Sequence, residues 1–195
     1  MSTSFATDSD DVRLERDVSW EAFASFLVAR GEKPPRVAYL EGTLETMSPS
    51  PTHELWCKNI ATMVEAYLDH IGIQYRGLRA WLLRSAPGLA GVEPDECYVF
   101  GYTPKPRPDL AIEVVWSSGS LDKLEIYRRL GVPEVWYCRR DAIEAYVLVD
   151  DRYERRTNSE CLPGFDFGYA IRLSDNEHLS ELRRLLRDRM PPRHP

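Results

Sequence analysis

Residues 107–137, RPDLAIEVVWSSGSLDKLEIYRRLGVPEVWY, carry the main signal for the fold. The apolar run LAIEVVW at 110–116 predicts a buried strand. The segment that follows, SLDKLEIYRRLG, predicts a helix that Ser120 caps and Gly131 ends, and EVWYC predicts a second strand. Glu113 is the one charged residue in the first of these strands, so its presence there needs a chemical reason.

Two helices and a hairpin are predicted upstream of this stretch. Helical periodicity marks a short helix in SWEAFASFLVAR and a long one in SPTHELWCKNIATMVEAYLDHIG, with Ser19 and Ser50 as N-caps. Pro51 suits the first helical position, because the amide it lacks has no partner there. The segment between the helices, RVAYLEGTLETMSPS, predicts two strands that turn around Glu41 and Gly42.

The remaining segments complete an α/β pattern. Strands are predicted in IQYR, AWLLRS, ECYVF, IEAYVLVD and RYERRT, and a terminal helix in HLSELRRLLRDRM. This order of elements indicates an α/β fold, with a mixed β-sheet flanked by helices. At 195 residues, we expect one domain over 13–195, preceded by a polar, disordered segment over 1–12.

Composition narrows the class of protein. The chain has no apolar run of the ~20 residues that cross a bilayer, and its first residues lack the pattern of a secretory signal, so we expect a cytoplasmic protein without a membrane partner. Its four cysteines are far apart in the sequence and predict reduced thiols that fill the core. The net charge of -6 disfavours non-specific binding to DNA, so any contact with nucleic acid must be local.

Glu113 is the first candidate for chemistry. Side chains alternate along a strand, so Glu113 shares a face with Ala111 and Val115, opposite the face of Ile112 and Val114. An unpaired ionised carboxylate inside a protein is very costly. It must be neutralised by a proton, by an arginine or lysine, or by a metal ion, and each choice describes a different protein.

Two further residues favour the metal. Asp95 follows Pro94 at the start of an apolar strand, and Lys123 lies in the first turn of the helix after the Glu113 strand. Two carboxylates on adjacent strands can hold a hard divalent cation, and a nearby ammonium can orient a water or offset the charge of a phosphate. The pattern is compatible with a phosphodiesterase centre.

These residues resemble the PD-(D/E)XK nuclease superfamily and, more closely, the Uma-type family of restriction-endonuclease-like proteins. The similar segments occur in order over residues 36–150: LEGTLETMSPSPTHE, EPDECYVF, PDLAIEVVWSS and DKLEIYRRLGVPEVWY. The first contains the hairpin and His53, which opens the long helix. The second and third contain Asp95 and Glu113, and the fourth contains Lys123.

The resemblance implies a restriction-endonuclease-like fold, a nuclease activity and a role for each matched residue. Asp95 and Glu113 correspond to ligands of Mg²⁺ or Mn²⁺, Lys123 to the catalytic lysine and His53 to a residue that lines the site. The implied substrate is nucleic acid, with DNA expected, and the implied assembly is a homodimer, because cutting a duplex needs two sites. Glu41 and Glu45 are the fallback candidates for a third carboxylate.

Structural interpretations of the same residues remain open. Glu113 could pair with an arginine such as Arg79 or Arg84, and His53 could satisfy free backbone groups at its helix start. Asp109 is interpreted as a strand-entry residue, whereas Tyr127 could line the site or fill the core. The alternative function is a nuclease fold that has lost its chemistry and serves as a binding or dimerisation module.

Overall fold

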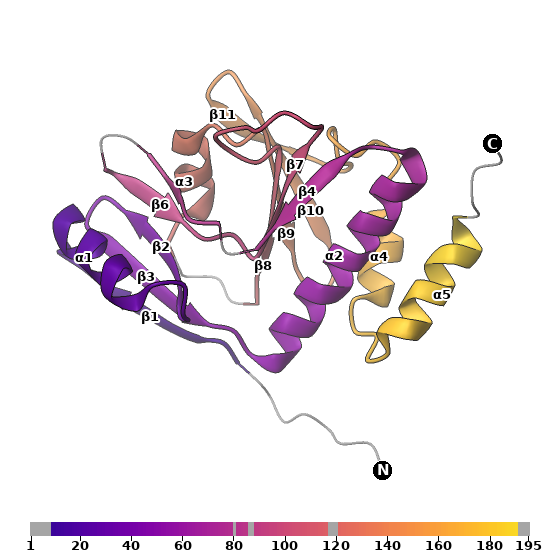
Figure 1. The fold of residues 1–195 in the computed structure, drawn as a ribbon, viewed down its shortest axis with the longest axis horizontal. Coiled ribbons are helices and arrows are strands. Elements are labelled where there is room, and N and C mark those ends of the chain that lie inside the picture. Colours follow the sequence, from indigo (N-terminus) through magenta and orange to yellow (C-terminus); the bar gives the residue numbers. More distant parts are fainter. Residues whose placement is uncertain (1–8, 80, 86–87, 117–120, 191–195) are drawn as a thin grey trace, which may run out of the picture.

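Two β-sheets and five helices make up the fold of the described residues. The structure is a computed structural model that describes residues 9–79, 81–85, 88–116 and 121–190. It confirms the predicted α/β class, and the mixed sheet is the larger of the two (Figure 1). The sequence predicted a single mixed sheet, but the structure has a second sheet, built mainly from the N-terminal third of the chain.

The larger sheet has six strands and carries Glu113 near its centre. Its spatial order is β11 (Arg152–Arg156), β10 (Ile143–Val149), β9 (Glu134–Cys138), β8 (Leu110–Val114), β7 (Glu96–Phe100) and β4 (Tyr75–Leu78). The β8–β9 pair is parallel and all the other pairs are antiparallel. Helix α3 (Lys123–Leu130) makes the crossover between the two parallel strands, as such a connection requires.

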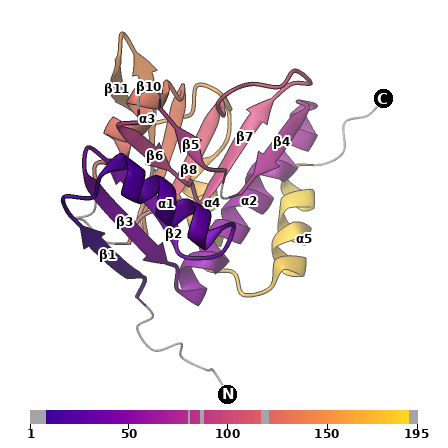
Figure 2. The same cartoon turned by 60° about the vertical axis from the view of Figure 1, so that its left-hand side comes forward.

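The smaller sheet is antiparallel throughout. Its order is β1 (Asp11–Glu15), β3 (Thr43–Ser48), β2 (Arg36–Leu40), β6 (Ala90–Val92) and β5 (Leu83–Arg84). Helix α1 (Trp20–Arg30) lies across this sheet, and its Phe23 ring stacks on Tyr39 of β2 with 4.7 Å between ring centroids (Figure 2).

Helix α3 lies between the two sheets, and its buried side chains contact both. Ile126 and Tyr127 pack in one apolar cluster with Val92 of the smaller sheet and with Ala111 and Val135 of the larger one. The other face of the larger sheet is covered by α2 (Pro51–Ile71), α4 (Phe167–Leu173) and α5 (Leu179–Arg189) (Figure 1). Strand β8 is therefore buried on both faces.

Local signals account for the ends of α2. The Ser50 hydroxyl accepts a hydrogen bond from the His53 amide, and Pro51 occupies the first turn. Gly72 ends the helix with φ 74°, a left-handed conformation that glycine adopts without steric cost. Because these signals lie within a few residues of each helix end, the predicted boundaries of α2 are confirmed.

The structure differs from the sequence interpretation in four elements. Asp11 and Val12 belong to β1, which pairs with β3, although disorder was expected up to residue 12. Strand β6 and helix α4 were not predicted, because three and seven residues are too short for a clear periodicity. Asp122 caps α3, because its side chain accepts a hydrogen bond from the Glu125 amide. Ser120, the predicted cap, and residues 1–8 lie outside the described residues.

Among the described residues, no helix combines the length and the apolar composition that a membrane span requires.

Candidate active site

Glu113 lies on the face of β8 that is covered by α3. Leu110, Ile112 and Val114 belong to the apolar cluster beneath α2, so the alternation predicted from the sequence is confirmed. The Glu113 side chain is 1% exposed. Its carboxylate must therefore find every partner within the protein.

Both partners of Glu113 come from one face of α3. The Lys123 ammonium donates to Glu113 Oε2 at 2.7 Å, and the Tyr127 hydroxyl donates to Oε1. Residues four apart on a helix lie on the same side, so a single helical turn supplies both donors. Among the described residues, Arg79 binds Glu54 and Glu96 instead, and Arg84 is exposed, so the alternative of an arginine partner for Glu113 is wrong.

Glu45 on β3 brings a second buried carboxylate to the same lysine. Its Oε1 lies 3.9 Å from Lys123 Nζ, and its Oε2 accepts from the Leu121 amide at 3.0 Å. Glu41, the other fallback candidate, is an exposed residue that pairs with Arg129. The structure therefore places Glu45, and not Glu41, beside Glu113 and Lys123.

The charges around Lys123 favour its protonated form. Burial opposes this, but the carboxylates of Glu113 and Glu45 outweigh burial and raise the pKa of Lys123. Burial and the Glu113 carboxylate likewise raise the pKa of Tyr127 well above its ordinary value, which keeps the phenol a donor. The site thus holds a fixed cation and a fixed hydroxyl donor against Glu113.

Asp95 lies immediately before β7 and is 1% exposed. Arg36 of β2 bonds to its Oδ1, and the Val114 amide donates to its Oδ2 at 2.8 Å. This last bond connects Asp95 to the residue that follows Glu113. Each predicted metal ligand therefore has its own cationic partner, Arg36 for Asp95 and Lys123 for Glu113.

His53 joins Asp95 to the N-terminal segment. Its Nδ1 lies 2.9 Å from Asp10 Oδ2, and its Nε2 lies 3.1 Å from Asp95 Oδ2 without the alignment of a hydrogen bond. Burial would raise the pKa of Asp10, but the bonds from His53 and from the Ser50 amide lower it. Asp10 was missed because the polar N-terminal sequence predicted disorder.

A cavity of about 200 Å³ opens above these residues. His53, Glu45 and Lys123 line it, whereas Asp95 and Glu113 are not on its surface. Its wall is completed by residues in or next to β1, β3, β8, β9 and α3: Asp10, Val12, Met47, Val114, Val115, Trp116, Leu121, Asp122, Tyr137 and Arg139. The cavity is therefore lined by both acidic and basic side chains, Lys123 among them.

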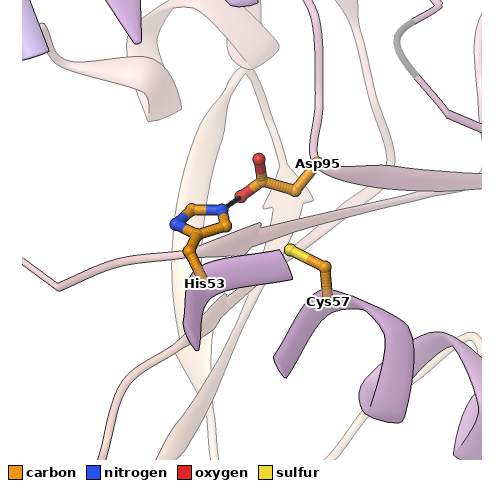
Figure 3. A group of neighbouring side chains, drawn as sticks. All are labelled: His53, Cys57 and Asp95. Carbon is orange, nitrogen blue, oxygen red and sulfur yellow. Dashed lines mark ion pairs between the residues drawn. The ribbon is translucent and has the colours of Figure 1, made fainter. Parts of the chain in front are cut away.

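Two donor sets could hold a metal. The oxygen set consists of Asp95, Glu113 and Glu45, the residue types that Mg²⁺ and Mn²⁺ prefer. The second set is His53, Cys57 and Asp95, whose ligand atoms lie within 4.8 Å of one another (Figure 3). Within the described residues, this is the one group of three potential metal ligands whose ligand atoms lie this close together. The role of Asp95 and Glu113 as a joint metal site stays a prediction.

Cys57 was interpreted from the sequence as core filler. Burial raises the pKa of its thiol to about 12, and the chain places it one helical turn after His53 on α2. The spacing of four residues between a histidine and a cysteine on a helix was the signal available in the sequence, because such residues share a face.

A family model described as Uma2, putative restriction endonuclease, matches residues 20–167. The chain belongs to the Uma2 family. The match includes Glu45, His53, Cys57, Asp95, Glu113, Lys123 and Tyr127. The resemblance stated from the sequence is therefore confirmed, and membership supports a nuclease at the level of reaction class.

Solved structures show the same fold. A crystal structure from Anabaena variabilis, of a putative nuclease belonging to DUF820, superposes with a TM-score of 0.53 at 16% identity. The match covers 87% of this chain and 99% of that chain. A comparison with curated proteins found no match.

We expect Lys123→Met to lower the free energy of unfolding by about 3 kcal/mol, because it leaves the buried Glu113 carboxylate without its cation. The side chain of Lys123 is 16% exposed, which places the cost at the lower end for a buried pair. Adding Glu113→Gln should restore most of the loss, since the amide carries no charge. Urea unfolding of the two single variants and the double variant measures this coupling. Additive losses would contradict it.

The carboxyl of Glu96 should make the free energy of unfolding depend on pH. Burial raises the pKa of this carboxyl to about 7, and Arg79, whose Nε is 2.8 Å away, limits the rise. The unfolded chain loses the proton near the ordinary value of 4.5, so the folded state binds more protons between these two values. Stability should therefore fall as the pH rises through this window.

The expected result is a smaller fall in unfolding free energy between about pH 4.5 and 7 for Glu96→Gln than for the wild-type protein. Urea unfolding at a series of pH values compares the two slopes. Parallel curves would show that Arg79 keeps the carboxylate ionised across this range.

Proposed function

We propose that this protein is a divalent-metal-dependent endonuclease that hydrolyses phosphodiester bonds of nucleic acid, with DNA as the first substrate to test. The observation that carries the proposal is the buried Glu113 carboxylate held by Lys123, with Asp95 bonded to the next residue of the same strand. Family membership adds the reaction class. A cavity beside the lysine gives a phosphate a place to approach.

The residues fit Mg²⁺ or Mn²⁺ by chemistry. Asp95, Glu113 and Glu45 offer only oxygen donors, and all three are buried. Such an ion, when bound, lowers the pKa of a coordinated water and polarises the phosphoryl oxygen. A divalent cation would compensate the carboxylates in the way that Arg36 and Lys123 do in this structure.

The chain's own residues have separable tasks in this proposal. Tyr127 keeps the Glu113 carboxylate in one orientation through its hydroxyl. Lys123 reaches the cavity and supplies a positive charge near the scissile phosphate, where electrostatic stabilisation in a shielded site is worth a few kcal/mol. His53 lines the same cavity, and its Nδ1 bond to Asp10 sets the orientation of the imidazole.

The alternative is a nuclease fold that acts only as a binding or dimerisation module. It is favoured by one observation, namely that Asp95 and Glu113 already have cationic partners within the protein. A fold without catalysis could keep these ion pairs for stability alone. Metal binding that depends on Glu113 separates the two functions.

The test of the nuclease is conversion of supercoiled plasmid to nicked and linear forms with Mn²⁺ or Mg²⁺. The wild-type protein should cut, and Glu113→Gln and Asp95→Asn should lose about a hundredfold or more in rate, as expected when a major electrostatic contributor is removed. Glu181→Gln on the exposed face of α5 is the matched control and should cut normally.

Circular dichroism of each variant establishes that it is folded before rates are compared. Equal cutting by wild type and Glu113→Gln would refute the proposed centre. No cutting by the wild-type protein, together with no Glu113-dependent metal binding, would favour the module.

We also propose that the nuclease works as a homodimer, because cleavage of both strands needs two centres. Strand β11 is an edge of the larger sheet, and an edge strand has unpaired backbone groups that a second copy can use. Light scattering should give about twice the 22.5 kDa chain mass. Glu154→Pro in the edge strand β11 should shift the mass to that of one chain. Val147 is not suitable for the same substitution, because its strand β10 lies inside the sheet.

A further inference from the structure

His53, Cys57 and Asp95 form a compact group of unlike donors. His53 and Cys57 lie one turn apart on α2, and Asp95 reaches them from the residue before β7. Figure 3 shows the imidazole and the thiol turned towards the carboxylate. All three residues are at most 1% exposed. Nothing in the nuclease proposal uses Cys57.

The His53 Nε2 atom faces Asp95 without a hydrogen bond to any of the described residues. It is buried, makes no hydrogen bond and lies 3.1 Å from Asp95 Oδ2. When Nδ1 donates its proton to Asp10, a neutral imidazole presents a lone pair at Nε2. A lone pair facing a carboxylate oxygen is repulsive unless a positive species lies between them.

We propose that His53, Cys57 and Asp95 bind a divalent cation of the Zn²⁺ or Co²⁺ class. Imidazole and thiolate are ligands of such borderline-soft ions, whereas Mg²⁺ binds oxygen. On binding, the Cys57 thiol releases its proton to solvent and the thiolate sulfur donates an electron pair to the ion. The two anionic ligands then balance the two positive charges of the ion, and the carboxylate of Asp10 on His53 Nδ1 offsets the charge of Arg36.

The geometry needs only a small adjustment. Ligand atoms around a tetrahedral Zn²⁺ are about 3.5 Å apart, given metal–ligand bonds of about 2.0–2.3 Å. In this structure the three ligand atoms are within 4.8 Å of one another. Arg36, which bonds to Asp95 Oδ1, also pairs with Glu54 at 2.6 Å, so a second carboxylate outside the group offsets its charge. His53 borders the cavity, which gives water a route to the fourth coordination position.

Asp95 would then belong to two sites. It is one of the oxygen ligands in the proposed nuclease centre and also the oxygen ligand of the His53–Cys57–Asp95 site. Occupancy by Zn²⁺ should therefore compete with the catalytic cation and inhibit cutting. Binding of Zn²⁺ itself does not rest on the proposed function; only the inhibition does.

The experiment is titration of the reduced full-length protein with Co²⁺, followed by near-ultraviolet and visible absorption. A thiolate ligand gives a sulfur-to-cobalt charge-transfer band, and we expect this band to saturate at one ion per chain. Cys57→Ala should abolish it, and Zn²⁺ should displace it. The affinity for Zn²⁺, measured by competition with a chromophoric chelator, should fall about tenfold or more in Cys57→Ala, since even outer ligand supports are worth that much.

Two control variants make the result specific. Cys161→Ala removes a thiol outside the group and should keep the band. Glu113→Gln should keep it too, while losing plasmid cutting, so failure of the nuclease proposal would leave the cobalt result standing. Absence of the band in the wild-type protein, or its survival in Cys57→Ala, would overturn this inference.

Discussion

The ion pair between Glu113 and Lys123 is the interaction on which the centre of the structure depends. A carboxylate that is completely buried requires a counter-charge within bonding distance, and α3 supplies it together with the Tyr127 hydroxyl. Because α3 packs between the two sheets, this requirement also fixes the helix relative to β8. The same ion pair places Lys123, on the crossover helix α3, in the candidate active site.

A second set of contacts closes the site from the opposite side. Arg36 of β2 and the His53 imidazole of α2 both converge on Asp95, and Asp10 holds the far nitrogen of that histidine. These residues come from four separate elements or their edges. The Asp95 carboxylate thus contacts residues of the smaller sheet, of the larger sheet and of the N-terminus of α2.

Asp95 also lies between two kinds of metal chemistry. On one side are the carboxylates Glu113 and Glu45, which suit a hard cation, and on the other are the imidazole of His53 and the thiol of Cys57, which suit a softer one. A cation's preference for oxygen or sulfur would decide which side it joins. In the proposed nuclease, an ion bound by His53 and Cys57 would therefore compete with the catalytic cation for Asp95.

The sequence by itself determined the elements whose signals are local. Ser50, Pro51 and Gly72 mark the ends of α2, and alternation along β8 places Glu113 opposite Ile112, because caps and side-chain periodicity act over a few residues. Lys123 and Tyr127 were within reach of the same reasoning, since they follow Glu113 by ten and fourteen positions.

Only the tertiary structure decided the contacts between distant segments. Asp10 meets His53 across 43 positions and Arg36 meets Asp95 across 59, and no periodicity in the sequence encodes such pairs. For the same reason Glu45 could not be chosen over Glu41, nor Cys57 recognised as a possible ligand, until β3 and α2 were placed against β7 and β8. Burial creates the need for a partner, and the packing of the two sheets selects which residue meets it.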